Sequence, residues 1–193
     1  MAAPQLMSRL DAINDILSLI GEAPLNTLAD VTSLDAINAI AALDRAQREC
    51  LSNPFWFNTE IITLSPSSEG IYVVPPSYLS VTPVKPEKDH YVQRGNKLYD
   101  LDTNSYGGQT ADLEVEVLVS LDWDELPQTA REAIQSTAAK HYAFSEVGEQ
   151  FLYQVASQNE RTAMAELYNE NLRQSKLSRL DGPVLRGVVR RWH

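Results

Sequence analysis

The stretch LEVEVLVSLDWDELPQTAREAI, residues 113–134, decides the fold because its hydrophobic period changes halfway along. In its first part apolar residues alternate with Glu114 and Glu116, which predicts a strand over Leu113–Val119 with one buried and one wetter face. Pro127 then suits the first turn of a helix. The apolar residues that follow recur on one broad helical face: Ala130, Ala133, Ile134, Ala138, Tyr142 and Phe144. The stretch therefore predicts a return from a β segment into helices.

Upstream of this stretch, from Phe57 onward, short β-rich runs alternate with Pro, Gly, Ser and Asn. Gly95-Asn96 fits a two-residue hairpin turn, since Gly tolerates the positive φ that such a turn requires. Pro75-Pro76 and Pro83 cannot donate ladder hydrogen bonds, so we expect edges or loops of the sheet there. The strands predicted before residue 113 are Asn58–Leu64, Ile71–Val74, Tyr78–Val81, His90–Gln93 and Lys97–Asp100.

Before Phe57 the apolar residues follow the helical period. A first helix is expected to end at Gly21, which tolerates a left-handed C-terminal cap, and Pro24 prevents its continuation. Its inward face is predicted to consist of Leu6, Leu10, Ile13, Leu17 and Ile20.

A second helix is predicted between Thr32 or Ser33, either of which can cap it, and Pro54, where it must stop. Phe55-Trp56-Phe57 directly after it is interpreted as an apolar plug under the helices. The inward residues of this helix are predicted to be Leu34, Ile37, Ala41 and Leu51.

Beyond Gly148, which is expected to break the preceding helix, a last helix is predicted from about Glu149 to Leu172. Its inward residues would be Phe151, Leu152, Val155, Ala156, Ala163, Leu167 and Leu172. Neither end of the chain can bury its apolar stripe alone, so the two ends must pack together. The predicted fold is α+β, a four-helix bundle of residues 1–56 and 123–175 around an inserted antiparallel β module, residues 57–122, with a C-terminal extension, residues 176–193.

The net charge of −10 argues against a general nucleic-acid binder, which needs clustered Lys and Arg. The single cysteine, Cys50, excludes an internal disulfide. Arg9, Asp11 and Asp15 interrupt the N-terminal apolar residues, so we expect neither a signal peptide nor a membrane anchor, and synthesis in the cytosol.

The C-terminal extension is basic, in contrast to the acidic remainder. It also holds apolar residues, so it is interpreted as a segment that docks on a partner. The candidate partner-binding residues are Arg186, Arg190, Arg191 and Trp192.

No nucleotide, zinc or hydrolase motif occurs in the chain, and His90, His141 and His193 are far apart in sequence. We therefore predict no catalytic residue, no cofactor and no metal site. The best enzymatic alternative is a hydrolase of peptidoglycan or polysaccharide that uses Glu114 and Glu116, about 6.5 Å apart on one strand face. Another alternative is a module that binds sugar or protein through Tyr72, Tyr78, Tyr91 and Tyr99.

Several separate blocks carry a family resemblance in the same order. The first is Ile13–Leu28, where a helix ends on Ile20-Gly21-Glu22-Ala23-Pro24, and the second is the aromatic block Asn53–Asn58. Further blocks are Tyr78–Ser80, Tyr91–Gly95, Leu98–Asp100 and Asp122–Pro127. Over about residues 10–170 the chain resembles the tail tubular protein A family, the head-to-tail adaptors of podoviruses, which are short-tailed phages.

The resemblance implies a structural protein of the virion tail that is not an enzyme and is made in the host cytoplasm. Such a protein is a subunit of a dodecameric ring between the portal protein and the tail nozzle, tail tubular protein B, with tail fibres attached around the junction. Genomic double-stranded DNA passes through the ring during ejection without specific binding. An acidic lumen suits this passage because it does not hold phosphates.

Overall fold

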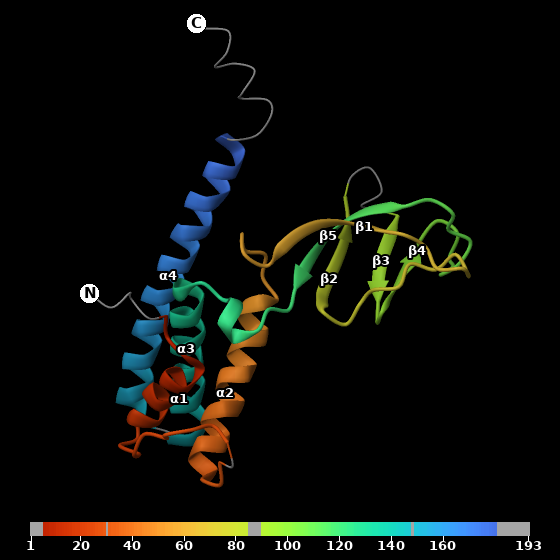
Figure 1. Cartoon of the computed structure of the whole chain (residues 1–193). Coiled ribbons are helices and arrows are strands. Elements are labelled where there is room, and N and C mark those ends of the chain that lie inside the picture. Colours follow the sequence, from red (N-terminus) through yellow and green to blue (C-terminus); the bar gives the residue numbers. More distant parts are fainter. Residues whose placement is uncertain (1–5, 30, 85–89, 148, 181–193) are drawn as a thin grey trace, which may run out of the picture. The chain divides into compact units, whose positions relative to one another are not determined.

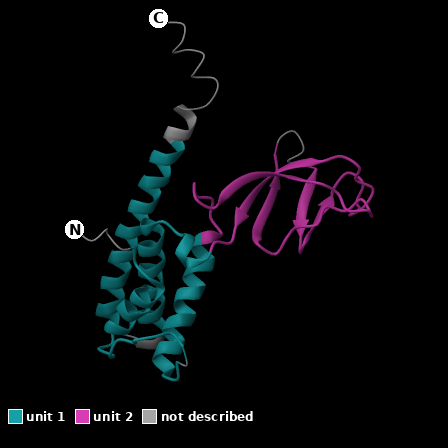
Figure 2. Ribbon diagram, viewed as in Figure 1, with its two compact units in different colours: residues 1–50, 122–193 teal, residues 51–121 magenta. Residues whose placement is uncertain are grey.

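The computed structural model describes residues 6–29, 31–84, 90–147 and 149–180, and it leaves the side chains of residues 146–147 and 176–180 undescribed. Along the described residues two α-helices are followed by strands in two antiparallel sheets and then by two further α-helices (Figure 1), so the predicted α+β class is confirmed. Residues 1–50 and 122–193 form one compact unit, called unit 1, and residues 51–121 form a second, called unit 2 (Figure 2).

Helix α1 spans Arg9–Ser18 and has specific hydrogen bonds at both ends. Ser8 and Asp11 form a capping box, in which each side chain accepts a bond from the backbone N–H of the other. Beyond the last turn Gly21 adopts a φ of +74°, and the N–H of Glu22 donates to the carbonyl of Leu17 at 3.3 Å. The left-handed glycine that ends the helix is therefore confirmed.

The inward face of α1 is narrower than predicted. Ile13 and Leu17 are buried, together with Ala12 and Ile16, whereas Leu6 lies before the helix and is 50% exposed. Leu6 follows the helical spacing but precedes Ser8, where the capping box begins the helix. The prediction for Leu6 was wrong.

Helix α2 spans Leu34–Leu51 and ends before Pro54, as predicted. Leu51 is buried, but Leu34 and Ile37 are 69% and 47% exposed, and Ala41 is exposed as well. Both stripes repeat every three or four residues, so the helical spacing does not tell them apart. The stripe that is buried consists of Ala36, Ala39, Leu43, Ala46 and Cys50.

Helix α3, Gln128–Tyr142, begins after Pro127 and packs along α4, Gln150–Leu180 (Figure 1). The predicted inward residues on α3 are buried, but Phe144 lies in the π-helical segment η3, Ala143–Val147, and is 72% exposed. The change from α to π geometry turns this ring off the buried face.

Helix α4 is longer than predicted and buries less of its apolar surface. Ala156 and Leu167 are buried as expected, whereas three predicted inward residues are exposed: Phe151 at 66%, Val155 at 41% and Leu172 at 57%. Glu160 lies on the buried side and pairs with Lys140 of α3 at 2.5 Å. The seam between α3 and α4 is therefore narrow and partly polar, so it leaves the flanking apolar residues outside.

Arg131 of α3 ties the two sequence segments of unit 1 together. The side chain is 4% exposed, and its guanidinium donates to three backbone carbonyls: Nε to Leu126 at 2.9 Å, Nη1 to Met7 at 2.7 Å and Nη2 to Asp124 at 2.9 Å. The planar fork of an arginine can serve three acceptors at once, which a lysine cannot match in geometry.

Met7, shortly before α1, is held at the same place by two further bonds. The carbonyl of Met7 also accepts from the indole Nε1 of Trp123 at 3.1 Å, and the N–H of Met7 donates to Oε1 of Gln128 at 2.9 Å. Trp123 is 4% exposed and lies in the 3₁₀ helix η2, Trp123–Glu125. Met7 is thereby fixed to the return of the chain from the β segment.

Replacing Arg131→Met removes the three donors, so the carbonyls of Leu126 and Asp124 lose this partner and that of Met7 keeps only the bond from Trp123. We expect the free energy of unfolding to fall by about 3 kcal/mol, measured by urea denaturation followed by circular dichroism. Arg161→Met, at an exposed position of α4, is the control and should change it by less than about 0.5 kcal/mol. Equal effects of the two substitutions would contradict the role of Arg131.

Unit 2 contains two antiparallel sheets. In the first, β5, Leu113–Val119, lies between β1, Thr59–Leu64, and β2, Tyr78–Pro83. In the second, β3, Tyr91–Arg94, pairs with β4, Lys97–Asp100, through the predicted turn, where Gly95 has a φ of +62°. Pro83 ends an edge strand, as expected for a residue that cannot donate to a ladder.

The predicted strand Ile71–Val74 does not form. Its segment makes one isolated bridge to the β3–β4 hairpin, Val73 to Lys97. The two backbone bonds of this bridge run from the N–H of Val74 to Asn96 and from the N–H of Leu98 to Tyr72. Pro75-Pro76 directly afterwards cannot continue a ladder, which limits the pairing to this short contact. Tyr72 and Val74 nevertheless point into the core, at 3% and 3% exposure.

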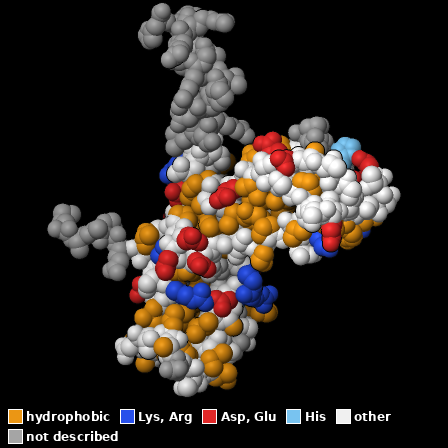
Figure 3. All heavy atoms as spheres, turned by 45° about the vertical axis from the view of Figure 1, so that its right-hand side comes forward, with side chains coloured by type: hydrophobic (Ala, Val, Ile, Leu, Met, Phe, Trp, Pro, Cys, Tyr) orange, Lys and Arg blue, Asp and Glu red, His pale blue; other side chains and the backbone are white. Residues whose placement is uncertain are grey.

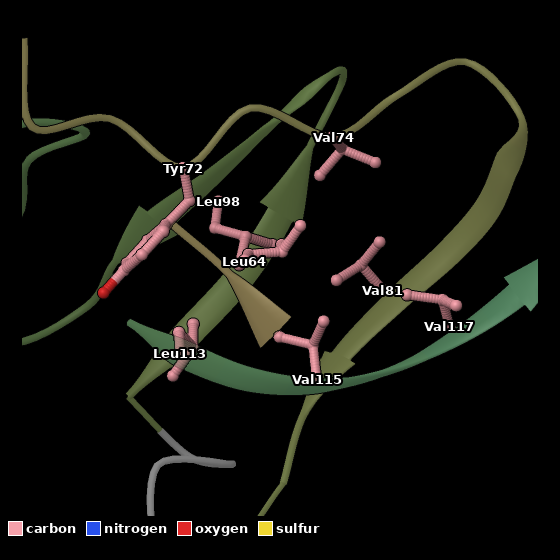
Figure 4. Packing of buried hydrophobic residues seen from close by; sticks show 8 residues of the cluster. All are labelled: Leu64, Tyr72, Val74, Val81, Leu98, Leu113, Val115 and Val117. Atoms are coloured by element: carbon pink, nitrogen blue, oxygen red, sulfur yellow. The ribbon is translucent and has the colours of Figure 1, made fainter. Parts of the chain in front are cut away.

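The core of unit 2 is filled from both sheets, whose side chains converge in Figure 4. On β5 the alternation predicted from the sequence is confirmed, with Val115 and Val117 buried and Glu114 and Glu116 exposed. Gln93 of β3 links the sheets because its Oε1 accepts from the N–H of Val81 on β2 at 2.8 Å. The buried residues are Leu64, Tyr72, Val74, Val81, Leu98, Leu113, Val115 and Val117.

Asn58 organises the chain where it enters β1. Its side chain is fully buried, Nδ2 donates to the carbonyls of Leu51 at 2.9 Å and Asn53 at 3.1 Å, and Oδ1 accepts from the N–H of Phe55 at 2.8 Å. Its carbonyl accepts from the N–H of Val119 at 2.8 Å. One asparagine therefore shapes the aromatic turn and joins the first and last strands of unit 2.

In Asn58→Asp the two donated bonds disappear and a carboxylate faces two carbonyls inside the protein. The folded-state pKa of this carboxyl should be raised above its unfolded value, so stability is lost as the pH rises. We expect a deficit of about 3 kcal/mol at pH 7 that shrinks toward pH 4, measured by urea denaturation at both pH values. Asn169→Asp, on an exposed turn of α4, should show neither the deficit nor its pH dependence.

Candidate assembly surfaces

Among the described residues no group of three His, Cys, Asp or Glu side chains could hold a metal ion. His90 pairs with Asp102, and Nε2 of His141 lies 3.7 Å from Oε2 of Glu49. His193 lies outside the described residues. Each of the two described histidines thus lies beside one carboxylate, fewer ligands than a metal site needs.

Glu114 and Glu116, the carboxylates of the hydrolase alternative, project from the same exposed face of β5. A glycosidase needs one protonated and one ionised acid, hence two unequal environments. Both glutamates are exposed alike, and their partners across the ladder are Thr63 and Ile61 of β1. The strand therefore lacks the asymmetry that the hydrolase mechanism requires.

The four tyrosines of the binding-module alternative do not form one aromatic groove. Tyr72 is buried, with its hydroxyl donating to the carbonyl of Ala111 at 2.7 Å, and Tyr91 and Tyr78 pack against the same core. Tyr99 alone among the four lies on the outer face of the β3–β4 hairpin, because strand residues alternate between faces.

The outer face of the β3–β4 hairpin carries cations against aromatic rings. The guanidinium carbon of Arg94 lies 3.7 Å from the centroid of the Tyr99 ring, and Nζ of Lys97 lies 6.0 Å from that of Tyr106. The two rings meet edge to face with centroids 4.9 Å apart. We call Arg94, Lys97, Tyr99 and Tyr106 the cation–aromatic face.

Asp100 positions Tyr106 on this face. Its Oδ1 accepts from the N–H groups of Asp102 at 2.8 Å and Thr103 at 3.0 Å, and its backbone bridges to Ser105, next to Tyr106. The backbone bond from Thr103 is the main reason why the pKa of Asp100 is lowered. The loop after β4 is therefore pinned by an ionised carboxylate that is 7% exposed.

In unit 1 a groove of about 490 Å³ runs between α2 and the turn from α3 to α4. Ala41 and Ala42 form one wall, and the rings of Phe144 and Tyr153, 5.7 Å apart, form another. His141 in the same groove has a pKa that burial lowers, so the imidazole is neutral at pH 7. Arg45 and Lys140 also line the groove, which therefore presents apolar walls beside two cations.

Unit 1 also exposes large apolar side chains on the elements that line the groove. Leu34 and Ile37 lie on α2, one to two turns before Ala41, and Phe144 and Phe151 flank the turn from α3 to α4. Figure 3 shows hydrophobic side chains gathered over the lower part of unit 1, below a band of charged ones. Exposed apolar side chains in such number favour an interaction site. We call Leu34, Ile37, Phe144 and Phe151 the apolar end.

The predicted partner-binding residues Arg186, Arg190, Arg191 and Trp192 lie outside the described residues. Helix α4 continues to Leu180, past Lys176, where the sequence predicted the basic extension to begin. No helix within the described part of the chain is long and apolar enough to cross a membrane.

Comparison with known proteins gives one consistent result. A model of the family described as tail tubular protein matches residues 10–177. Tail tubular protein A of Klebsiella phage KP34 is 28% identical over 173 residues, which cover 89% of this chain and 91% of the phage protein. The match includes both helical segments and all of unit 2. The chain therefore belongs to the tail tubular protein family, whose members are structural components of the virion tail and not enzymes.

Proposed function

We propose that this protein is a head-to-tail adaptor: a dodecameric ring between the portal protein and the tail nozzle, tail tubular protein B, with tail fibres around the junction. The observation that carries the proposal is the family match over residues 10–177, together with 28% identity to a tail tubular protein A. The number of subunits rests on the family resemblance alone.

In this proposal residues 1–56 and 123–175 act as a four-helix bundle that builds the ring, and residues 57–122 act as an arm toward the next tail component. The carbonyl bonds of Arg131 and the pairing of Arg9 with Asp44, which joins α1 to α2, would keep the helical part rigid under load. The core shared by both sheets would do the same for the arm.

The apolar end supports an assembling subunit. Phe144 and Phe151 are 72% and 66% exposed. In a monomer, such exposed rings would lower the solubility and would not stabilise the fold. Covering one such side chain is worth about 1.5–3 kcal/mol, so a few of them suffice to bias a subunit toward assembly. In the assembled tail they would be covered by a neighbouring subunit or by the portal.

The net charge of −10 supports a conduit that lets DNA slide. A wall that presents carboxylates repels phosphates, so genomic double-stranded DNA would pass without specific binding.

The apolar end can be tested by Phe144→Ser with Phe151→Ser. We expect this variant to remain folded by circular dichroism, because both rings are exposed, but to lose ring formation with the portal protein in size-exclusion chromatography with light scattering. Leu172→Ser, on the same helix as Phe151 and 57% exposed, is the control and should still form rings. A wild-type chain that stays monomeric with portal and nozzle present would refute the adaptor function itself.

The basic extension forms a separate part of the proposal, in which Arg186, Arg190, Arg191 and Trp192 dock on the portal. Truncation after Leu180 leaves α4 whole and removes these residues. The truncated protein should unfold at the same urea concentration as the full chain but bind portal at least about tenfold more weakly, measured by surface plasmon resonance. If the truncated protein binds portal with unchanged affinity, the extension does not dock on the portal.

A further inference from the structure

The cation–aromatic face of unit 2 presents two positive charges side by side. Arg94 and Lys97 are direct partners in the β3–β4 register, so their Cβ atoms are about 5 Å apart. Among the described residues neither cation has a carboxylate within 4.0 Å. Val92, on the same face, is 39% exposed and adds an aliphatic contact.

The outer face of the other sheet presents the complementary pattern. Glu114 and Glu116 lie two residues apart on β5, about 6.5 Å from each other, and neither forms an ion pair within the described part of the chain. Ile61, the register partner of Glu116, is 62% exposed. We call Glu114, Glu116 and Ile61 the acidic face.

The two faces are complementary: they carry charges of opposite sign, each presents two charges about 5–6.5 Å apart, and each has an exposed aliphatic residue beside them. They belong to different sheets whose inner sides share one core (Figure 4). The outer sides therefore diverge, and one copy cannot bring its own two faces together. A contact between them must join different copies head to tail, and head-to-tail contacts close into rings when the rotation allows it.

We propose that the cation–aromatic face of one copy docks on the acidic face of a second copy of this chain. The contact rests on the ring assembly proposed above and adds a subunit interface to it within the β arm. The guanidinium of Arg94 lies against the Tyr99 ring, so that this side chain loses little freedom on docking, and Lys97 lies at the outer limit of such a contact with Tyr106. Salt should weaken the contact because the charges are exposed.

A charge swap tests the pairing. Arg94→Glu with Lys97→Glu makes both faces acidic, and Glu114→Lys with Glu116→Lys makes both basic, so each variant alone should raise the dissociation constant for assembly at least roughly 100-fold. Mixed in equal amounts, the two variants restore opposite charges at every contact and should assemble again by mass photometry. Glu114→Asp with Glu116→Asp keeps the charges and should assemble like the wild type.

Cross-linking tests the geometry independently of ring size. Lys97→Cys with Glu116→Cys in one chain should give a ladder of dimers, trimers and larger species with a short bis-maleimide. Each single substitution should give no ladder, because a head-to-tail contact brings position 97 of one copy to position 116 of another. The native thiol interferes little, since Cys50 is 7% exposed and burial raises its pKa to about 12.

The outcomes separate the two proposals. Wild-type rings without a ladder, or without rescue in the mixture, overturn this interface and leave the adaptor function standing. Binding of the cation–aromatic face to portal, nozzle or fibre instead of a second copy would show as cross-links to those proteins and would equally overturn it. A monomeric wild type in the presence of portal and nozzle refutes the adaptor function, while the ladder at high protein concentration still reports on the interface.

Discussion

The helical unit depends on the buried guanidinium of Arg131. It donates to the carbonyl of Met7, which lies 124 residues earlier in the sequence, and to carbonyls at the return from the β segment. Joining such distant segments costs loop-closure entropy before any packing is gained. The three charge-assisted hydrogen bonds of the Arg131 guanidinium offset part of this entropy cost. The surrounding helices can then bury their apolar stripes.

Local chemistry made much of the fold predictable. The alternation along β5 and the Gly95-Asn96 turn are signals of short range, and the structure has both where the sequence indicated them. The inward faces of α2 and α4 were less predictable. Each of these helices carries one apolar stripe that is buried in its own core and further apolar residues that stay exposed. Both sets repeat with the helical period, so the spacing alone does not tell which set is buried. Leu34, Phe144 and Phe151 were assigned to the core on that basis, although they are exposed.

The surfaces were harder to predict than the fold. Register counting from the Gly95-Asn96 turn would have put Arg94 opposite Lys97 and Tyr99 outward, but Tyr106 joins them only through the loop that Asp100 pins. The buried bonds of Arg131 and Asn58 leave no mark in a hydrophobic pattern, since both residues are polar and usually exposed. Such residues are recognised once the partner carbonyls are located in space.

The bond between Asn58 and Val119 closes the β segment where it begins and where it ends. A segment whose two ends meet can be inserted at one place in a host sequence with little demand on the host, because the host needs to supply only two neighbouring attachment points. The β unit is therefore a self-contained insertion with neighbouring ends. Recombination between phages could therefore exchange the β unit as one piece and leave the helical part unchanged.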